Sequence, residues 1–286
     1  MGNLKGNGTL SGKGRYTIGF LNEDITFTGK LDGCLITKVG SGMWTLTLPN
    51  NYGTGTTEVK GGILNLNHGN ADTPFFGNNN LTVSDSGVVA GRAQLYNVYL
   101  QAGGGIRPGS ATSSYPIGSL KIKTSLYAYE GSHLDFFVLN AKNSGTSRSY
   151  LEVDGTLSIQ GVVNVTTKGY TPNEGDEIIL WTAGSVTGTP TAINLPDISE
   201  YNLAWDTSDL MNTTGVIRVV SSTKITKIDH NAQTKVFVYR ENGAHVATFD
   251  ALRSDVEKRI RRYGRGTYIL RITDGRRSEN IKIIIK

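Results

Sequence analysis

Three residues whose side chains can exchange protons lie close together in the sequence: Glu130, His133 and Asp135. They fall in the segment Ser125–Leu139, whose alternation of apolar and polar residues predicts a β-strand. Alternate residues of a strand point to the same side, so we expect His133 and Asp135 on one face. A carboxyl group beside an imidazole can work as a general acid or base, which makes this trio the strongest catalytic candidate.

Acid-base chemistry on a glycan would need more than this trio. A glycosidase uses two carboxylates about 5–10 Å apart, and the sequence places no second acid opposite. A solvated strand face is the simpler interpretation. Arg92 and Arg107 could pair with Asp85 or Asp72 and bind a uronate, as polysaccharide lyases do, although isolated surface charges explain them as well.

Other patterns that carry chemistry are absent from the sequence. It holds no Gly-x-Ser-x-Gly motif and no Gly-Lys-Ser/Thr phosphate loop. The four histidines are scattered without the spacing of metal ligands: His68, His133, His230 and His245. Cys34 is the single cysteine and is expected to be buried as a small apolar residue. We therefore expect no metal site and no cofactor.

Charge and glycine divide the chain into two parts. The net charge of +5 hides a segment from Thr223 to Lys286 with 15 Lys and Arg against 7 Asp and Glu, a net of +8. The preceding residues carry a net of −3 and hold 32 of the 36 glycines. This shift in composition predicts two domains, residues 1–222 and 223–286.

The first part repeats a loose unit of two short apolar runs separated by glycine. Glycines that precede an apolar residue recur at irregular intervals: Gly33, Gly62, Gly87, Gly105 and Gly155. In a right-handed parallel β-helix, rungs stack at about 4.8 Å, and glycine allows the corners that need positive φ. The spacing therefore predicts an all-β chain that begins with such a helix.

One segment adds a family resemblance. Gly42–Leu66, which reads GMWTLTLPNNYGTGTTEVKGGILNL, resembles the repeat of autotransporter passenger domains. Leu151–Gly161 and Gly175–Trp181 resemble the closing rungs of such passengers. The resemblance implies a β-solenoid whose last rungs, from about residue 170, form a modified cap that protects an open sheet edge.

The second part is patterned as antiparallel hairpins. Asn242-Gly243 joins two apolar strands and Asp274-Gly275 joins two more, which predicts a small β-sandwich. The stretch Ser254–Arg262 could form a short helix, but its two apolar residues do not decide the matter.

Eight residues of this tail carry a family resemblance: Asn242, Gly243, Gly264, Gly266, Tyr268, Leu270, Lys282 and Lys286. With them the tail resembles the C-terminal sorting domain of type IX secretion substrates. The Pro-Asn-Pro motif of that family is missing, and Ile228–Ala232 stands near its place. The resemblance implies secretion, or anchoring at the outer-membrane surface of a Gram-negative bacterium.

A basic run is the strongest electrostatic feature of the tail: Arg253, Lys258, Arg259, Arg261, Arg262 and Arg265. Nucleic-acid binding would require interleaved aromatic residues, and only Tyr263 and Tyr268 are near. Contact with anionic lipopolysaccharide or with an acidic secretion channel fits better, and a solvated face that keeps the domain soluble remains open.

The sequence thus favours a non-enzymatic, adhesin-like surface protein that binds a glycan or a host surface, with a carbohydrate-active β-helix enzyme as the alternative. No segment is apolar enough to span a membrane as a helix, and any export signal is expected outside this chain. An enzyme should show a groove in which two acids, or an acid and a basic residue, converge within about 10 Å.

Overall fold

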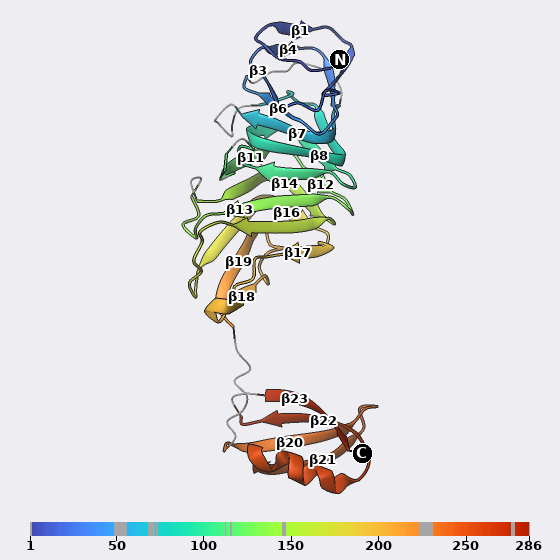
Figure 1. Ribbon diagram of the computed structural model, residues 1–286, viewed down its shortest axis with the longest axis vertical. Coiled ribbons are helices and arrows are strands. Elements are labelled where there is room, and N and C mark those ends of the chain that lie inside the picture. Colours follow the sequence, from blue (N-terminus) through green and yellow to red (C-terminus); the bar gives the residue numbers. More distant parts are fainter. Residues whose placement is uncertain are drawn as a thin grey trace. The chain divides into compact units, whose positions relative to one another are not determined.

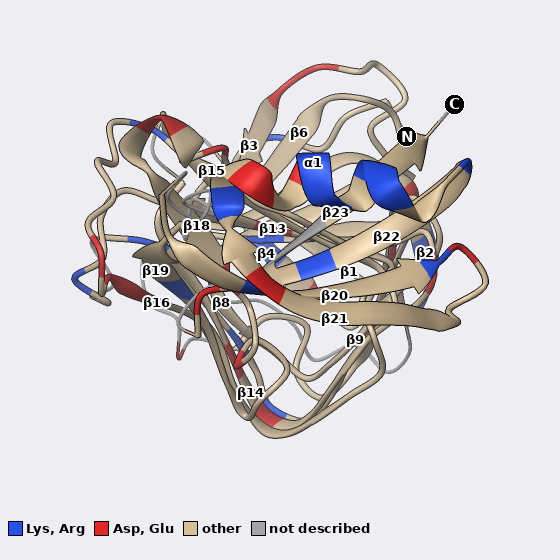
Figure 2. Cartoon of the chain, turned by 90° about the horizontal axis from the view of Figure 1, so that it is seen from below, with Lys and Arg blue, Asp and Glu red and all other residues tan. Residues whose placement is uncertain are grey.

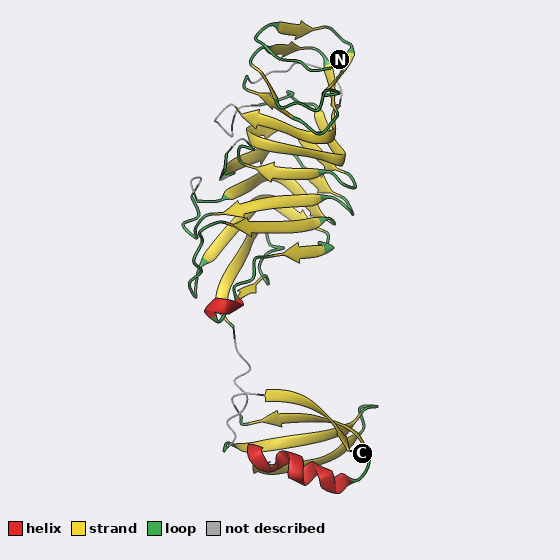
Figure 3. Ribbon diagram, in the orientation of Figure 1, coloured by secondary structure: helices red, strands yellow, loops and turns green. Residues whose placement is uncertain are grey.

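The computed structural model describes residues 2–48, 56–67, 72, 74–111, 113–114, 116–144, 147–222, 231–275 and 278–285. The chain forms two compact units, Met1–Ser221 and Ser222–Lys286. Both are built from β-strands, and the described residues contain one short α-helix and three short 3-10 helices (Figures 1 and 3). The all-β prediction is therefore confirmed.

In the described residues, the first unit contains a mixed sheet of 17 strands, most of which pair in parallel. Strands from successive passes of the chain lie side by side in three stacks, and the longest strands bend from one stack into the next. The first stack contains β2 (Arg15–Ile18), β5 (Leu35–Lys38), β9 (Asn97–Leu100), β12 (Leu126–Ala128) and parts of β7 (Thr57–Asn67), β8 (Asn80–Leu95), β14 (Ser149–Ile159) and β16 (Glu177–Thr187).

The second stack carries the candidate site, and the third closes the sheet. The second contains β3 (Ile25–Phe27), β6 (Met43–Leu46), β10 (Gly105–Pro108), β13 (His133–Val138), β15 (Val162–Thr167), β17 (Ala192–Asn194) and parts of β7 and β8. The third contains β11 (Gly118–Ile122), parts of β8, β14 and β16, and the antiparallel strands β19 (Thr214–Ser221) and β18 (Leu203–Asp206). A separate parallel pair joins β1 (Thr9–Ser11) to β4 (Lys30–Asp32).

Inward residues of all three stacks form one apolar core. In the second stack, Leu64, Val89 and Ile106 occupy the same register position on successive strands, and each is fully buried. Such stacking buries the alternate apolar residues of each strand and leaves the others facing outward.

Glycine is required at some of the corners. Gly62 lies opposite Gly87 in the register and has a φ of 59°. A Cβ atom on Gly62 would lie 2.4 Å from the carbonyl oxygen of Gly42 on the preceding pass. Two of the glycines expected at corners, Gly62 and Gly87, are thus in register, whereas Gly105 pairs with Val88 and lies one residue out of line.

The second unit is a four-stranded antiparallel sheet in the order β21-β20-β22-β23. Its strands are β20 (Gln233–Arg240), β21 (His245–Leu252), β22 (Gly266–Thr273) and β23 (Ser278–Ile285). Both predicted hairpins are present, and Gly243 and Gly275 have positive φ in their turns.

The described part of this unit differs from the predicted sandwich, because its four strands form one sheet rather than two facing ones. The short helix α1 (Val256–Ile260), which lies between the short 3-10 turns η2 (Arg253–Asp255) and η3 (Arg261–Tyr263), packs against this sheet. Val256 and Ile260, four residues apart on one side of the helix, are fully buried with Val236 and Leu270.

Among the described residues, no helix combines the length and the apolar character that crossing a membrane would take.

Candidate functional site

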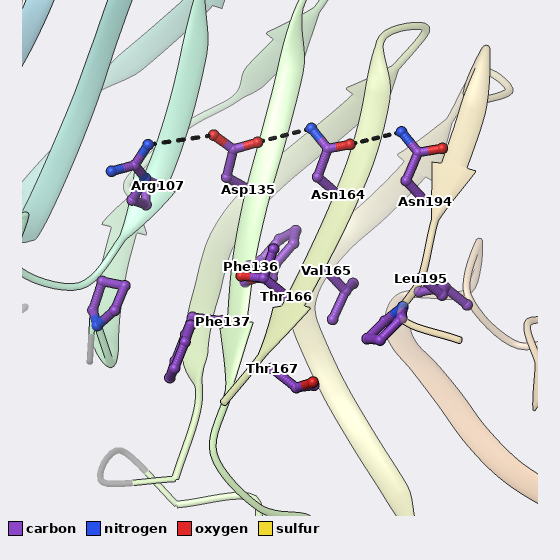
Figure 4. A pocket seen from close by; sticks show the side chains of 12 residues that line it. Arg107, Asp135, Phe136, Phe137, Asn164, Val165, Thr166, Thr167, Asn194 and Leu195 are labelled. Atoms are coloured by element: carbon purple, nitrogen blue, oxygen red, sulfur yellow. Dashed lines mark hydrogen bonds and ion pairs between the residues drawn. The ribbon is translucent and has the colours of Figure 1, made fainter. Parts of the chain in front are cut away.

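Four polar side chains form a row across the outer face of the second stack, joined by two hydrogen bonds and one ion pair (Figure 4). Asn194 Nδ2 donates to Asn164 Oδ1 at 2.8 Å, and Asn164 Nδ2 donates to Asp135 Oδ1 at 2.9 Å. An Arg107 terminal nitrogen lies 3.9 Å from Asp135 Oδ2. We call Arg107, Asp135, Asn164 and Asn194 the polar ladder.

The ladder follows from strand alternation and register. Asp135 on β13 lies opposite Asn164 on β15, which in turn lies opposite Asn194 on β17. Leu134 precedes Asp135 on β13, and Val163 precedes Asn164 on β15. Both apolar residues point inward and are fully buried, so the polar residue that follows each of them faces outward.

The ladder borders a surface groove of about 790 Å³. Its apolar lining includes Pro116, which precedes β11, Phe137 near the end of β13, and Leu195 and Pro196, which follow β17. Figure 4 shows the ladder along one side of the groove, with Phe137 and Leu195 on the other. The remaining lining residues are Phe136, Val165, Thr166 and Thr167.

Asp135 is the ionisable centre of the ladder. Burial by itself would raise the pKa of its carboxyl group, but hydrogen bonds from His133 and Asn164 and the charge of Arg107 outweigh burial and hold the pKa below its usual value. The carboxylate is therefore ionised at neutral pH and accepts on both of its oxygens.

His133 and Asp135 share one face of β13, as predicted, and His133 Nδ1 lies 3.0 Å from Asp135 Oδ2. The imidazole sits over Gly105, where a Cβ atom would lie only 2.0 Å from the ring. His133 is not among the residues that line the groove. Its position supports Asp135 from outside the groove.

Glu130 does not join the predicted trio. It lies exposed in the turn before β13 and is not part of the groove lining. Asp135 is the single acid that the described groove contains.

The two arginines also differ from the predicted pairing with Asp85 or Asp72. Arg107 faces Asp135 on the neighbouring strand, whereas Arg92 donates to the carbonyl oxygen of Ile117. Asp72 lies 3.7 Å from Lys121 instead.

The residues expected for a sorting domain occupy structural positions. Asn242 accepts from the Ala244 amide within the first hairpin turn. Tyr268 is fully buried and its hydroxyl donates to the carbonyl oxygen of Tyr263, and Leu270 is also in the core.

Gly264 and Gly266 have positive φ on either side of Arg265. Lys282 Nζ pairs with Glu241 at 2.7 Å, and Lys286 lies outside the described residues, as do His68 and His230.

The basic run lies on α1 and the turns around it (Figure 2). Arg259 contacts other residues of the second unit. Its guanidinium lies 4.9 Å from the Phe249 ring centre and donates to the Asp250 carbonyl oxygen at 2.6 Å. Arg253 is half-buried. The exposed members are Lys258, Arg261, Arg262 and Arg265, and Arg259 is exposed as well.

Sequence reasoning missed Asn164 and Asn194. A signal was present, because both lie between two apolar residues in short strands, as Val163-Asn164-Val165 and Ile193-Asn194-Leu195. Such a repeat predicts that two outward amides share a column, but their register is set by the length of the loop between the strands.

The described residues hold no cluster of three or more His, Cys, Asp or Glu side chains that could bind a metal ion. Cys34 is buried, and burial raises the pKa of its thiol. The groove offers hydrogen bonds, one ion pair and apolar contact.

No protein family model matches the chain, and no curated protein matches its sequence.

Proposed function

We propose that the first unit is a right-handed parallel β-helix that binds carbohydrate without cleaving it. Three stacks of parallel strands, the apolar columns inside them and the glycine corners support the solenoid. The antiparallel strands β18 and β19 serve as the modified closing rungs.

The polar ladder beside an apolar wall is the observation that carries the proposal. A pyranose ring has a hydroxyl-rich edge and apolar C–H faces, so it fits a groove with amides and a carboxylate on one side and Phe137, Leu195 and Pro196 on the other. The row of groups on four successive strands suits an extended glycan, which can contact several of them at once.

The groove lacks the parts of a two-carboxylate hydrolase. Its described lining holds one acid, and that acid is hydrogen-bonded on both oxygens and has a lowered pKa, which makes it a weak base. Binding therefore accounts for the groove better than catalysis does.

A carbohydrate-active enzyme is the second candidate, and one observation favours it. Arg107 and Asp135 lie 3.9 Å apart in the groove, which meets the criterion of an acid and a basic residue converging. A lyase would use the arginine to neutralise a uronate and would still need a base, for which His133 has the right chemistry but lies outside the lining.

The second unit, in our proposal, directs export or anchors the protein at the surface of a Gram-negative bacterium. The exposed residues Lys258, Arg261, Arg262 and Arg265 offer positive charge for lipopolysaccharide phosphates or for an acidic secretion channel. Its two hairpins and its terminal strand support the resemblance to a sorting domain.

Binding is tested with a glycan array followed by calorimetry on the full chain. Asn164→Ala and Asn194→Ala should each weaken the selected glycan about tenfold. Asn97→Ala is the matched control, because Asn97 Nδ2 donates to Asn80 Oδ1 at 3.1 Å in a similar amide pair of the first stack. Equal affinity of all three variants would refute the groove as the binding site.

Catalysis is tested by incubating the same glycan with the protein and measuring new reducing ends and unsaturated products. We expect neither. Release of these products that disappears in Asp135→Asn would establish the enzyme instead.

Deletion of residues 223–286 in the native host should abolish export, and unchanged export would refute the sorting role.

A further inference from the structure

Three tyrosines stack on the outer face of the first stack, away from the groove strands. The rings of Tyr99 on β9 and Tyr127 on β12 lie 5.3 Å apart with planes only 12° from parallel. Tyr129, just after β12, lies 6.5 Å from Tyr127 at 14° and is 39% exposed. The three rings form an aromatic step on the surface.

The strand register shows on which side of Tyr127 the opposite residue is not aromatic. Tyr127 lies opposite Tyr99 on one side and opposite Ser158 of β14 on the other. The next position beyond Ser158 is Thr187 of β16. A serine side chain ends at Oγ and is too short to cover a phenol ring. The side of Tyr127 that is turned toward β14 is therefore bordered by the short side chains of Ser158 and Thr187.

The surface beside this face is lined with hydroxyl groups. Thr156 and Ser158 on β14 lie opposite Ser185 and Thr187 on β16, and the hydroxyls of Thr156 and Ser185 are 3.0 Å apart. Strands β12, β14 and β16 pair in this order. An aromatic face therefore stands next to a floor of four hydroxyl residues.

The charge around the tyrosines selects the kind of ligand. The register column of Tyr99 and Tyr127 also holds Thr37, Glu58, Thr82 and Ser158. Its one charged residue is Glu58, which forms ion pairs with Arg15 and Lys60 at 3.3 Å. Stacked nucleic-acid bases need a positive track for the phosphates, which this column does not offer. A neutral ring with C–H faces and hydroxyl edges suits both the aromatic face and the floor.

We propose that Tyr127 and the hydroxyl floor form a second glycan-binding surface, on which a neutral pyranose stacks against the free face of Tyr127. The hydroxyls of the pyranose exchange hydrogen bonds with Ser158 and Thr187, and Tyr129 widens the aromatic surface that Tyr127 offers. The groove belongs to the second stack and this surface to the first, so the inference does not depend on the groove.

Extending the tyrosine column separates binding from a purely structural role. Ser158→Tyr adds a ring over the free face of Tyr127, which blocks the platform while it lengthens the stack. Thr82→Tyr is the matched control, since Thr82 lies opposite Tyr99, on the other side of the tyrosine pair from Ser158. It adds a ring and leaves the face of Tyr127 open.

Saturation-transfer NMR and calorimetry with cellohexaose, N-acetylchitohexaose and mannohexaose provide the measurement. We expect at least one probe to bind the full chain with strongest transfer to its axial C–H protons. Ser158→Tyr and, as a second variant, Tyr127→Leu should each weaken it about tenfold, with Thr82→Tyr within about twofold.

The groove variants keep this outcome distinct from the first proposal. The double variant Asn164→Ala/Asn194→Ala should retain the axial C–H signal even if groove binding is lost. Binding that survives both Ser158→Tyr and Tyr127→Leu, binding that is lost equally in Thr82→Tyr, or no binding of any probe would overturn the tyrosine surface.

Discussion

Asn164 donates from its side-chain nitrogen to one oxygen of the Asp135 carboxylate, 2.9 Å away on the neighbouring strand. A carboxylate only accepts, so this bond fixes which way the Asn164 amide points. The Asn164 oxygen then faces Asn194 and accepts from its nitrogen at 2.8 Å. Asp135 thereby sets the direction of the whole polar ladder.

Asp135→Asn should weaken groove binding about tenfold, because an amide can donate as well as accept and no longer orients Asn164 or holds Arg107. Calorimetry with the array-selected glycan measures this. Asp154→Asn is the control, since Asp154 forms a 2.8 Å ion pair with Lys123 outside the groove. Equal losses in both variants would contradict an orienting role for Asp135.

The same carboxylate should give a stability difference that depends on pH. The pKa of Asp135 is lowered in the folded chain from its ordinary 3.8, so its contribution is present above about pH 4 and is lost as pH falls through the folded pKa. Urea unfolding of the wild type and Asp135→Asn from pH 2 to 6 should show the wild-type advantage shrinking below pH 3.8. A constant difference across this range would contradict it.

Gly105 and His133 should be coupled in stability. Gly105→Ala places a methyl group 2.0 Å from the imidazole and should cost about 1–3 kcal/mol. In a His133→Ala background the same change should be nearly neutral, because the ring is gone and alanine restricts the unfolded chain. A double-mutant cycle by urea unfolding measures the coupling, and additive effects would show that the ring can move aside freely.

Local sequence patterns were sufficient for the hairpins and for the pairing of His133 with Asp135. Asn242-Gly243 has few alternatives to a tight turn, and residues two apart in a strand share a face whatever the fold. Contacts between distant strands are different. The interval from Asp135 to Asn164 depends on an intervening loop, so no local pattern reveals that their side chains meet.

The second unit shows a similar limit. Ser254–Arg262 carries two apolar residues, too few to indicate a helix alone, yet Val256 and Ile260 fill the core beside Leu270. Tertiary packing decides whether the two hairpins form two facing sheets or one sheet covered by a helix. The same holds for Glu130, whose distance from Asp135 follows from a turn.

Lys38 should give the protein a stability signature at alkaline pH. Its ammonium group is buried and donates to the carbonyl oxygens of Val39, Gly40 and Gly61 at 2.8, 3.1 and 2.9 Å. Burial lowers its pKa from 10.5 to about 8, against a smaller opposing effect of Asp24. The folded chain therefore releases this proton before the unfolded chain does.

Between pH 8 and 10.5 the unfolded state binds more protons at Lys38, so the wild type should gain stability relative to Lys38→Met as pH rises, by up to about 3 kcal/mol. The substitution should itself cost about 2–4 kcal/mol at neutral pH, because three carbonyl groups lose their donor. Urea unfolding of both proteins from pH 7 to 11 cancels the other titrations in the difference. A flat difference would mean that the amine keeps its proton in the fold, with its three hydrogen bonds outweighing the loss of hydration.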